Sequence, residues 1–200
     1  MALFRLLEIT QGRISIDGIN VRQIPLEILR SRLSAIPQDV IMFSGSIREN
    51  LDPLSKHKDQ ELWNALEVAQ VKDIVASHSE GLNFEVKEGG ENFSSGQLQL
   101  LCMARAILRK SSIVVLDEAT SALDAITEKC LLKAVSTAFE NRTVIVIAHR
   151  VSALLDCDRV IVLHDGKIVE DGSPADLTQR QEGFFANMLK SNEENRVTNC

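Results

Sequence analysis

The sequence predicts an α/β fold in which helices cover a mostly parallel β-sheet. Two continuously apolar segments, 113–116 and 144–148, are typical of strands that are buried on both faces. A segment with helical periodicity, 124–139, connects them. Because two strands joined by a helix usually lie parallel in one sheet, both are expected to belong to the same core. A helix over 94–110 is predicted just before the first of these strands.

Shorter elements are predicted on the N-terminal side of this core. They are the tail of a helix, a hairpin, a short helix, a short strand and a longer helix, over residues 3–8, 12–18, 25–31, 33–36 and 59–70. Pro25 suits the start of the short helix, Pro37 stops the strand, and Asp59 can cap the longer helix.

The C-terminal part is predicted to contain a second hairpin and a further helix. Strands over 159–164 and 167–171 flank Asp165-Gly166, a dipeptide typical of two-residue hairpin turns. The segment Ser173-Pro174-Ala175-Asp176 predicts a capped helix start with proline at the first helical position. From about residue 190 onward the chain is polar and is expected to fray.

Length, charge and cysteine spacing limit the class of protein. The 200 residues suit one domain, and the net charge of -6 argues against nucleic acid as the main partner, because phosphate backbones bind a basic face. No apolar stretch approaches the roughly 20 residues that cross a membrane. The four cysteines are scattered without a CxxC pair, so neither a zinc site nor a redox pair is expected. Free cysteines of this kind are typical of proteins in a reducing compartment. We expect one domain over 1–189, with a helical subdomain at about 54–110 and a polar tail over 190–200.

Candidate catalytic side chains follow the two apolar strands. Asp117 and Glu118 close the first strand, and His149 closes the second. Since ligands bind at the carboxyl ends of parallel strands, these side chains could share one pocket. One carboxylate there can hold Mg²⁺ while the other polarises an attacking water. The alternatives are surface acids at a strand end and a histidine that is structural or merely exposed.

Two further segments carry candidate ligand contacts. Phe93-Ser94-Ser95-Gly96-Gln97 lies at the start of the helix over 94–110, where small residues leave backbone N–H groups open to an anion. An ordinary helix cap is the competing interpretation. Gln38, just after the strand at 33–36, could orient a water or a metal ion, or could be an ordinary loop amide.

The order and spacing of these segments resemble the nucleotide-binding domains of ABC transporters from residue 1 to about 189. Residues 113–118 resemble the Walker B segment, Phe93–Gln97 the signature motif in a variant with Phe first, and 121–124 the D-loop; Gln38 resembles the Q-loop glutamine and His149 the switch histidine. Residues 50–53, 88–93 and 100–106 resemble the second nucleotide-binding domain of the multidrug-resistance-associated (C) subfamily.

The resemblance implies a P-loop NTPase-like fold that uses ATP and Mg²⁺. Asp117 would hold Mg²⁺ through water, with Gln38 as a second candidate at the metal. Glu118 would act as general base on the attacking water. Gln38 would also sense the γ-phosphate and pass its state to transmembrane helices, and His149 would contact the γ-phosphate.

The resemblance also implies two kinds of partner. A second nucleotide-binding domain would form a head-to-tail ATP sandwich, in which Ser94, Gly96 and Gln97 face an ATP bound on that partner and Asp124 bridges the two domains. Phe93 and Ser95 belong to the same candidate surface. Transmembrane domains would place the chain at the cytoplasmic face of a membrane. Nucleic acid is not expected as a partner.

The sequence departs from the family in its phosphate-binding loop. No Gly-x-x-x-x-Gly-Lys-Ser/Thr motif occurs, and the single Gly-Lys pair, Gly166-Lys167, is followed by Ile168 in a predicted turn. The family's loop precedes a helix like the one expected at 3–8, so we expect this chain to begin inside that helix, without the N-terminal strands. Because the loop cradles the phosphates, the isolated chain is expected to be catalytically incompetent. Leu98 replaces the usual polar or basic residue after Gln97.

Three functions remain open from the sequence. The first is the ATP-binding and hydrolysing module of an ABC exporter. The second is a non-catalytic truncated or spliced product that at most contributes its signature face to a partner's ATP site. The third is an ABC-type ATPase of DNA repair or translation, which the acidic balance and the lack of a coiled-coil insertion disfavour.

Overall fold

The computed structural model describes residues 1–120, 123–180 and 182–197. The chain divides into two compact units, Met1–Ile145 and Val146–Cys200, and each is described by itself. Ser121 and Ala122 of the expected D-loop lie outside the described residues.

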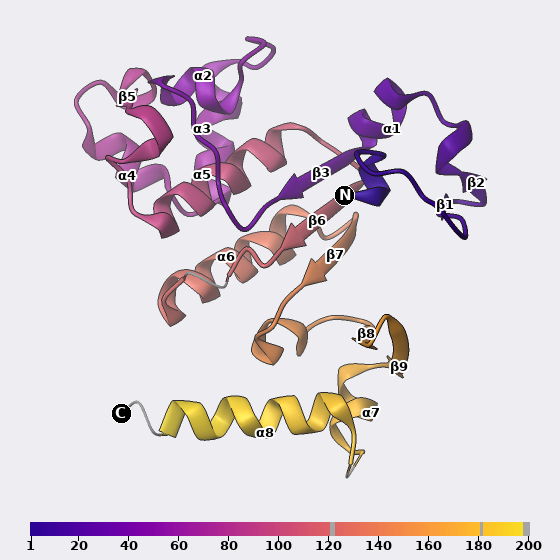
Figure 1. Cartoon of the computed structure of the whole chain (residues 1–200). Helices are drawn as coiled ribbons and strands as arrows, with labels where there is room; N and C mark the ends of the chain where they lie inside the picture. Colours follow the sequence, from indigo (N-terminus) through magenta and orange to yellow (C-terminus); the bar gives the residue numbers. More distant parts are fainter. Residues whose placement is uncertain (121–122, 181, 198–200) are drawn as a thin grey trace. The chain divides into compact units, whose positions relative to one another are not determined.

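A three-stranded sheet forms the centre of the first unit. Its strands are β3 (Leu33–Ile36), β6 (Ile113–Asp117) and β7 (Thr143–Ile147), in the order β3-β6-β7 (Figure 1). β3 and β6 pair in parallel. The Thr143 N–H donates to the Ser112 carbonyl at 3.1 Å, so β7 begins beside the start of β6. The parallel pair of β3 and β6 was not predicted, whereas the predicted parallel orientation of the 113–116 and 144–148 strands stays a prediction.

Burial differs between the two apolar strands. Val114, Val115 and Leu116 of β6 are buried, as predicted for a strand in the middle of a sheet. In β7, exposed and half-buried residues alternate, so the prediction of burial on both faces is wrong for this strand. The burial differs because β7 is the last strand of the described sheet and has a neighbouring strand on one side only.

A group of helices packs beside this sheet. It consists of α2 (Ile47–Leu51), α3 (Asp59–Val68), α4 (Lys72–Ser77) and α5 (Ser95–Leu108), together with the short pair β4 (Gly45–Ser46) and β5 (Glu85–Val86) and the 3-10 turns η3 (Gly81–Asn83) and η4 (Glu88–Gly90) (Figure 1). α5 contacts α2, α3, β3 and the crossover helix α6 (Ala125–Ala138). The expected helix at 59–70 is α3, but Asp59 is its first helical residue and Lys58 occupies the cap position. Asp59 instead pairs with Arg48, with N–O distances of 2.6 and 2.9 Å.

The N-terminal residues do not form the expected helix tail over 3–8. Only the 3-10 turn η1 (Ala2–Phe4) is present, and Arg5 ends it with a left-handed backbone, φ 51°. The Arg5 guanidinium donates to the carbonyls of Val21 and Ile24, and Leu3 packs with Phe4 against a core cluster. These tertiary contacts favour a turn over a continuing helix.

The remaining N-terminal elements agree with the sequence. β1 (Ser15–Ile16) and β2 (Ile19–Asn20) form the predicted antiparallel hairpin around Asp17-Gly18. The turn η2 (Val21–Gln23) and the helix α1 (Leu26–Arg32) follow. Buried Val21, Leu29 and Leu33 form the core cluster of this region.

The second unit contains the predicted C-terminal hairpin and helices. Its elements are the 3-10 turn η5 (Val151–Leu154), β8 (Val160–His164), β9 (Lys167–Gly172), α7 (Pro174–Thr178) and α8 (Phe184–Val197). β8 and β9 pair antiparallel, and Ser173 caps α7 by accepting from the Asp176 N–H at 3.1 Å, so both predictions are confirmed. α8 continues to Val197, where we expected a frayed tail from about residue 190.

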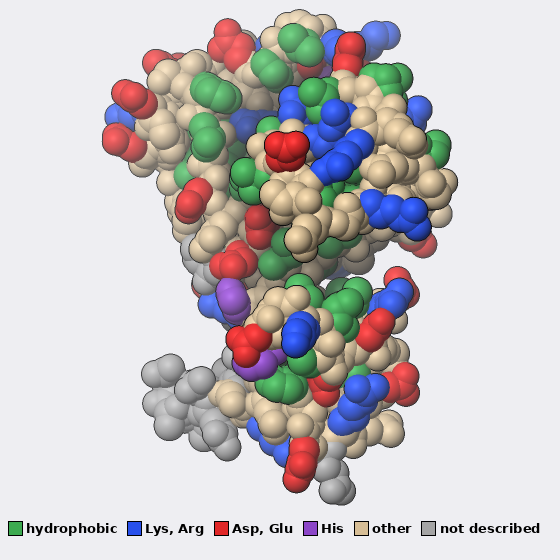
Figure 2. Space-filling model, turned by 45° about the vertical axis from the view of Figure 1, so that its right-hand side comes forward, with side chains coloured by type: hydrophobic (Ala, Val, Ile, Leu, Met, Phe, Trp, Pro, Cys, Tyr) green, Lys and Arg blue, Asp and Glu red, His purple; other side chains and the backbone are tan. Residues whose placement is uncertain are grey.

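Apolar side chains of the hairpin divide between a core and the surface. Val160 packs with Val151, Leu177 and Phe185 in a buried cluster. Ile161, Leu163 and Ile168 are exposed. Figure 2 shows hydrophobic side chains on the surface of this part of the chain among charged ones.

The ion pair across this hairpin makes its stability depend on pH. Two hydrogen bonds of 2.6 and 2.7 Å join the Arg159 guanidinium to the Asp171 carboxylate, and they lower the pKa of Asp171. A lowered folded-state pKa contributes stability above the unfolded pKa of about 4, and that contribution is lost as the pH falls through the folded value. We expect amide exchange of residues 160–172 to rise more steeply below pH 4 in the wild type than in Asp171→Asn. Equal pH dependence of the two proteins would contradict this assignment.

Candidate functional site

The ends of β3 and β6 bring three predicted site residues to one edge of the sheet. Ile36 and Leu116 are the last registered pair of the two parallel strands. Gln38 lies two residues beyond Ile36, and Glu118 lies two residues beyond Leu116. Gln38 and Asp117 are exposed, and Glu118 is half-buried. Two carboxylates and an amide therefore lie beyond the carboxyl ends of neighbouring strands, where α/β proteins bind ligands.

The backbone of Glu118 has an uncommon conformation. Its φ is 50°, in the left-handed region that a residue with a side chain seldom adopts. The neighbouring Ala119 and Thr120 are buried, so the chain turns sharply into the interior directly after Glu118. Backbone strain of this kind is often found at functional sites, although turns such as the one at Asp17 have it as well. Of the two acids, only Glu118 has this conformation.

The start of α5 is organised by a reciprocal pair of hydrogen bonds. The Ser94 hydroxyl accepts from the Gln97 N–H at 3.2 Å, and the Gln97 side chain accepts from the Ser94 N–H at 2.9 Å. This capping box uses both side chains to satisfy backbone donors. It holds the first turn of a 14-residue helix in a defined position, with Ser94 and Ser95 exposed. The ordinary helix cap is thus observed, and the anion-facing turn stays a prediction for the same segment.

Phe93 supports this turn from inside the protein. Its ring is only 9% exposed and meets the rings of His78 and Phe84 edge-on, with centroids 6.3 and 6.0 Å away. His78 and Phe84 are themselves stacked at 3.7 Å. The Phe93 side chain therefore anchors the loop before α5 and does not offer a surface to ATP, although we had included it among the candidate binding residues.

Gly96 and Asp124 lie close together through the first turn of α6. A Cβ on Gly96 would stand 3.0 Å from the Thr127 side chain, so α6 approaches this position closely. The Asp124 carboxylate accepts from the Thr127 N–H at 3.0 Å and from its hydroxyl at 2.6 Å. Asp124 therefore caps α6 while it lies beside the predicted signature segment. A side chain at position 96 would therefore have to displace the Thr127 methyl group slightly.

Leu98, whose effect the sequence left open, packs over Gly90. A Cβ on Gly90 would stand 2.6 Å from a Leu98 methyl carbon, and the φ of Gly90 is +79°. The leucine is half-buried and covers the turn that precedes Phe93. It therefore contributes to packing of the loop before α5.

A pair of neighbouring glycines tests this packing. We expect Gly90→Ala to lower the free energy of unfolding by about 2–3 kcal/mol, because it adds left-handed strain and a collision with Leu98. Gly89→Ala is the matched control, since its φ is +65° but nothing lies within 4 Å of its Cβ position. It should cost about 1 kcal/mol, from strain alone. Urea denaturation measures the free energy of unfolding of both variants. Equal losses of stability would show that Leu98 makes no close contact at Gly90.

Two polar residues of α5, buried Gln99 and half-buried Arg105, hold the segment after β3 and were not predicted from the sequence. The Gln99 amide donates to the carbonyls of Gln38 and Pro37, and Arg105 donates to the carbonyls of Asn50 and Ile41. A charged residue within the apolar stripe of a helix indicates that a polar partner lies inside, so the contacts of Arg105 could have been expected from the sequence. Those of Gln99 could not, because single amide side chains are common on helix surfaces.

His149 belongs to the second unit, two residues beyond the end of β7, and it is exposed. Gln38, Asp117 and Glu118 belong to the first unit. The predicted common pocket of His149 and Glu118 therefore stays a prediction.

The carboxylates fit a Mg²⁺ ion that is shared with a phosphate ligand. Within the described part of the chain, no three His, Cys, Asp or Glu side chains gather as a metal site. Mg²⁺ in nucleotide sites usually has one or two protein carboxylates and completes its shell with water and phosphate oxygens. Asp117, the exposed last residue of β6, could provide one such ligand, and this assignment stays a prediction.

Comparison with known proteins places this site in a family. A family model described as "ABC transporter" matches residues 1–121, which include Gln38, the signature segment and both acids. The chain belongs to the ABC transporter family. Members of this family bind ATP, in agreement with the ligand that the sequence predicted.

The relatives of this ABC transporter chain are of the C subfamily. It is 50% identical over 193 residues to human ATP-binding cassette sub-family C member 8 and 50% identical to sub-family C member 2 of Rattus norvegicus, in each case over 96% of this chain. It is 47% identical over 189 residues to ABC transporter C family member 9 of Arabidopsis thaliana. The chain spans 12% of the length of each of these relatives.

A solved structure confirms the fold class. The ABC transporter chain superimposes with a TM-score of 0.89 and 34% identity on a bacterial Atm1-family ABC exporter with ATP bound, over 96% of this chain and 34% of that one. The fold is thus α/β, with a P-loop NTPase-like parallel sheet and a group of helices. No helix in the described ranges is long and apolar enough to cross a membrane.

Proposed function

We propose that this chain is the ATP-binding and hydrolysing module of an ABC exporter, coupling nucleotide turnover to transport by transmembrane domains. The proposal depends on one observation in the first unit. The neighbouring strands β3 and β6 end at the same edge of the sheet, where Gln38, Asp117 and Glu118 lie. The start of α5 is joined to the same region, because Gln99 donates to the Gln38 carbonyl at 2.8 Å.

Each residue of this edge has a role in the proposed reaction. Asp117 is the ligand of Mg²⁺, which neutralises charge on the phosphates when it is bound. Glu118 accepts the proton of the attacking water as general base. Gln38 contacts the γ-phosphate side of the site and the metal, and His149 donates to the γ-phosphate.

The signature segment serves a partner domain in this proposal. Backbone N–H groups at the start of α5 and the exposed Ser94 and Ser95 suit an anion. A second nucleotide-binding domain would bring its ATP to this turn in a head-to-tail arrangement, with Asp124 at the boundary. Transmembrane domains would hold the pair at the cytoplasmic face of a membrane.

The second candidate function is a non-catalytic one, and the missing loop motif favours it for the isolated chain. The 200 residues contain no Gly-x-x-x-x-Gly-Lys-Ser/Thr sequence. Phosphoryl transfer is catalysed mainly by positioning and charge stabilisation, so a chain without the phosphate cradle lacks most of the catalysis. Such a chain retains the signature face and could complete a partner's ATP site.

The rate of Mg-ATP hydrolysis by the 200-residue chain tests its proposed catalytic incompetence. We expect no turnover above background, in both the wild type and Glu118→Gln. Turnover that Glu118→Gln abolishes would overturn the proposed incompetence of the isolated chain.

A chimera tests the catalytic edge itself. Placing the phosphate-loop segment of rat sub-family C member 2 before Met1 should restore hydrolysis. Glu118→Gln in this chimera should lower kcat by about 10²–10⁴-fold, the usual contribution of a general base. Glu85→Gln, at an exposed position of β5, is the matched control and should leave kcat unchanged. Equal rates in the two variants would refute the assignment of Glu118 as the base.

A further inference from the structure

Two main-chain carbonyls in the segment directly after β3 accept hydrogen bonds from α5, a helix far along the sequence. The Gln99 side-chain amide donates to the Gln38 carbonyl at 2.8 Å and to the Pro37 carbonyl at 3.3 Å. Gln99 is 4% exposed and both bonds are partly buried, so they are partly shielded from solvent. Partly buried carbonyls that lose their donors carry a desolvation penalty, which makes the Gln99 amide energetically important for this segment.

Arg105 holds the far end of the same segment. Its guanidinium donates to the Asn50 carbonyl at 2.8 Å and to the Ile41 carbonyl at 3.3 Å. Asn50 in turn donates to the Phe43 carbonyl and accepts from the Phe43 N–H. Residues 37–43 are therefore fixed at both ends by polar side chains.

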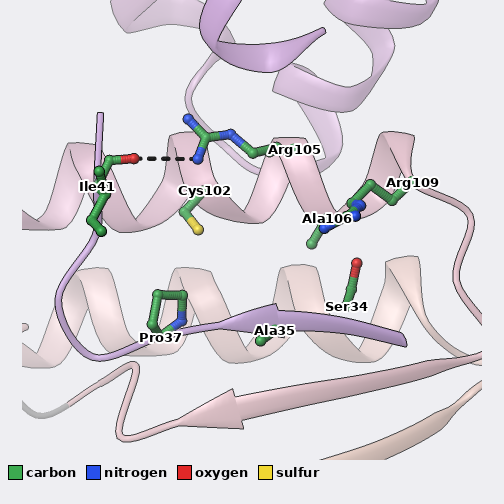
Figure 3. A pocket seen from close by; sticks show the side chains of 8 residues that line it. All are labelled: Ser34, Ala35, Pro37, Ile41, Cys102, Arg105, Ala106 and Arg109. Atoms are coloured by element: carbon green, nitrogen blue, oxygen red, sulfur yellow. Dashed lines mark hydrogen bonds between the residues drawn. The ribbon is translucent and has the colours of Figure 1, made fainter. Parts of the chain in front are cut away.

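A cavity lies between the middle of this segment and α5. Its volume is about 240 Å³, and it is bounded by Ser34, Pro37, Ile41, Cys102, Arg105 and Ala106, among others (Figure 3). The Ser34 hydroxyl is buried without a hydrogen-bond partner in the structure, and the Cys102 sulfur points toward the β3 side of the cavity. Side chains do not fill the space beneath the segment, so its position depends on the two polar attachments more than on packing.

We propose that Gln99 is a positioning residue, which ties the main chain at Gln38 to α5 so that Gln38 follows any displacement of the predicted signature helix. Ser94 and Gln97, which cap α5, lie within one and a half turns of Gln99 on the same helix. A shift of the α5 start is transmitted to the Gln38 carbonyl through a rigid helix and two hydrogen bonds. The role of Gln38 in ATP turnover rests on the proposed function, whereas the attachment itself does not.

Cys102 provides a local readout of this attachment. The thiol lines the cavity beside Ile41, and burial raises its pKa, with Arg105 acting in the opposite direction. The resting thiol should therefore react slowly with N-ethylmaleimide. Gln99→Met removes both hydrogen bonds at similar volume, so residues 37–41 should open more often and uncover Cys102. We expect its modification, followed by mass spectrometry on the 200-residue chain, to be about tenfold faster.

Amide exchange measures the Gln38 segment directly. Exchange of residues 38–42 should also be about tenfold faster in Gln99→Met, while the modification rates of Cys130 and Cys157 stay unchanged. Gln99→Asn keeps the amide on a shorter side chain, so modification of Cys102 and exchange of residues 38–42 should rise to the same extent. This variant replaces Gln99→Met if the latter does not fold. Gln60→Met is the matched control, because Gln60 donates only to Asn64 on an exposed face of α3.

Two results would overturn the proposal. One is an unchanged rate for Cys102 and for residues 38–42 in both Gln99 variants. The other is an equal acceleration of Cys102, Cys130 and Cys157, which would make Gln99 a general stabiliser of the core. Gln38→Ala should leave the Cys102 rate unchanged, since Gln99 bonds the main chain of that residue. No readout uses nucleotide, so failure here is distinguishable from failure of the proposed ATPase function.

Discussion

Arg105→Ala is expected to lower the free energy of unfolding of the first unit by about 2–3 kcal/mol, because two carbonyls lose a charged donor and a half-buried side chain is removed. The guanidinium donates to the carbonyls of Asn50 and Ile41 and contacts the Met42 sulfur at 3.1 Å. Burial lowers the pKa of Arg105, so the charged group has a desolvation cost that these bonds offset. Alanine removes that cost but leaves the carbonyls unsatisfied and opens space beside an existing cavity.

Comparison with two other variants identifies the cause of this loss. Arg109→Ala changes an exposed arginine one turn further along α5, and we expect a change within about 0.5 kcal/mol. Arg105→Met keeps much of the side-chain volume and should cost less than alanine but more than Arg109→Ala. Urea denaturation of the three proteins measures the series. A loss below about 1 kcal/mol in Arg105→Ala would contradict the importance of the carbonyl contacts.

The central elements could be predicted from local sequence. The apolar run at 113–116 and the alternation around Asp17-Gly18 and Asp165-Gly166 are set by burial and turn chemistry over a few residues. The structure accordingly contains β6 and the two hairpins at those places. The crossover connection predicted only that the 113–116 and 144–148 strands share a sheet, and β6 and β7 are neighbours in the observed order.

The errors arose where distant parts of the chain decide the outcome. Arg5 reaches the carbonyls of Val21 and Ile24, and this contact with residues far along the chain ends the expected helix after one 3-10 turn. The apolar composition of residues 144–148 cannot distinguish a central strand from one at the end of a sheet. Asp59 was expected to cap its own helix, but its carboxylate is engaged by Arg48 from α2.

The candidate site divides in the same way. Its acids and amide could be found because they follow apolar strands at recognisable positions. The left-handed backbone of Glu118, the internal position of the Phe93 ring and the Gln99 attachment depend on packing between elements. Spacing along the sequence contains no information about those contacts, which decide how the site residues are oriented.

Glu170→Ala is expected to destabilise the second unit by about 2–3 kcal/mol, because it removes a buried acceptor from the start of a helix. The Glu170 carboxylate accepts from the Phe185 N–H at 2.9 Å in the first turn of α8, and the residue is 7% exposed. A carboxylate at this position also interacts favourably with the positive end of the helix dipole. In its absence the Phe185 N–H is left buried without its acceptor.

The isosteric change Glu170→Gln separates the hydrogen bond from the charge. Its side-chain oxygen can still accept from Phe185, so we expect a loss of only about 1 kcal/mol, from the weaker dipole interaction. Gly183→Ala gives a second test, since a Cβ there would stand 2.6 Å from a Glu170 carboxylate oxygen and displace it. Amide exchange of residues 160–190 follows the unit selectively. If Glu170→Ala and Glu170→Gln exchange at equal rates, the carboxylate contributes charge alone, and the start of α8 does not depend on its hydrogen bond to Phe185.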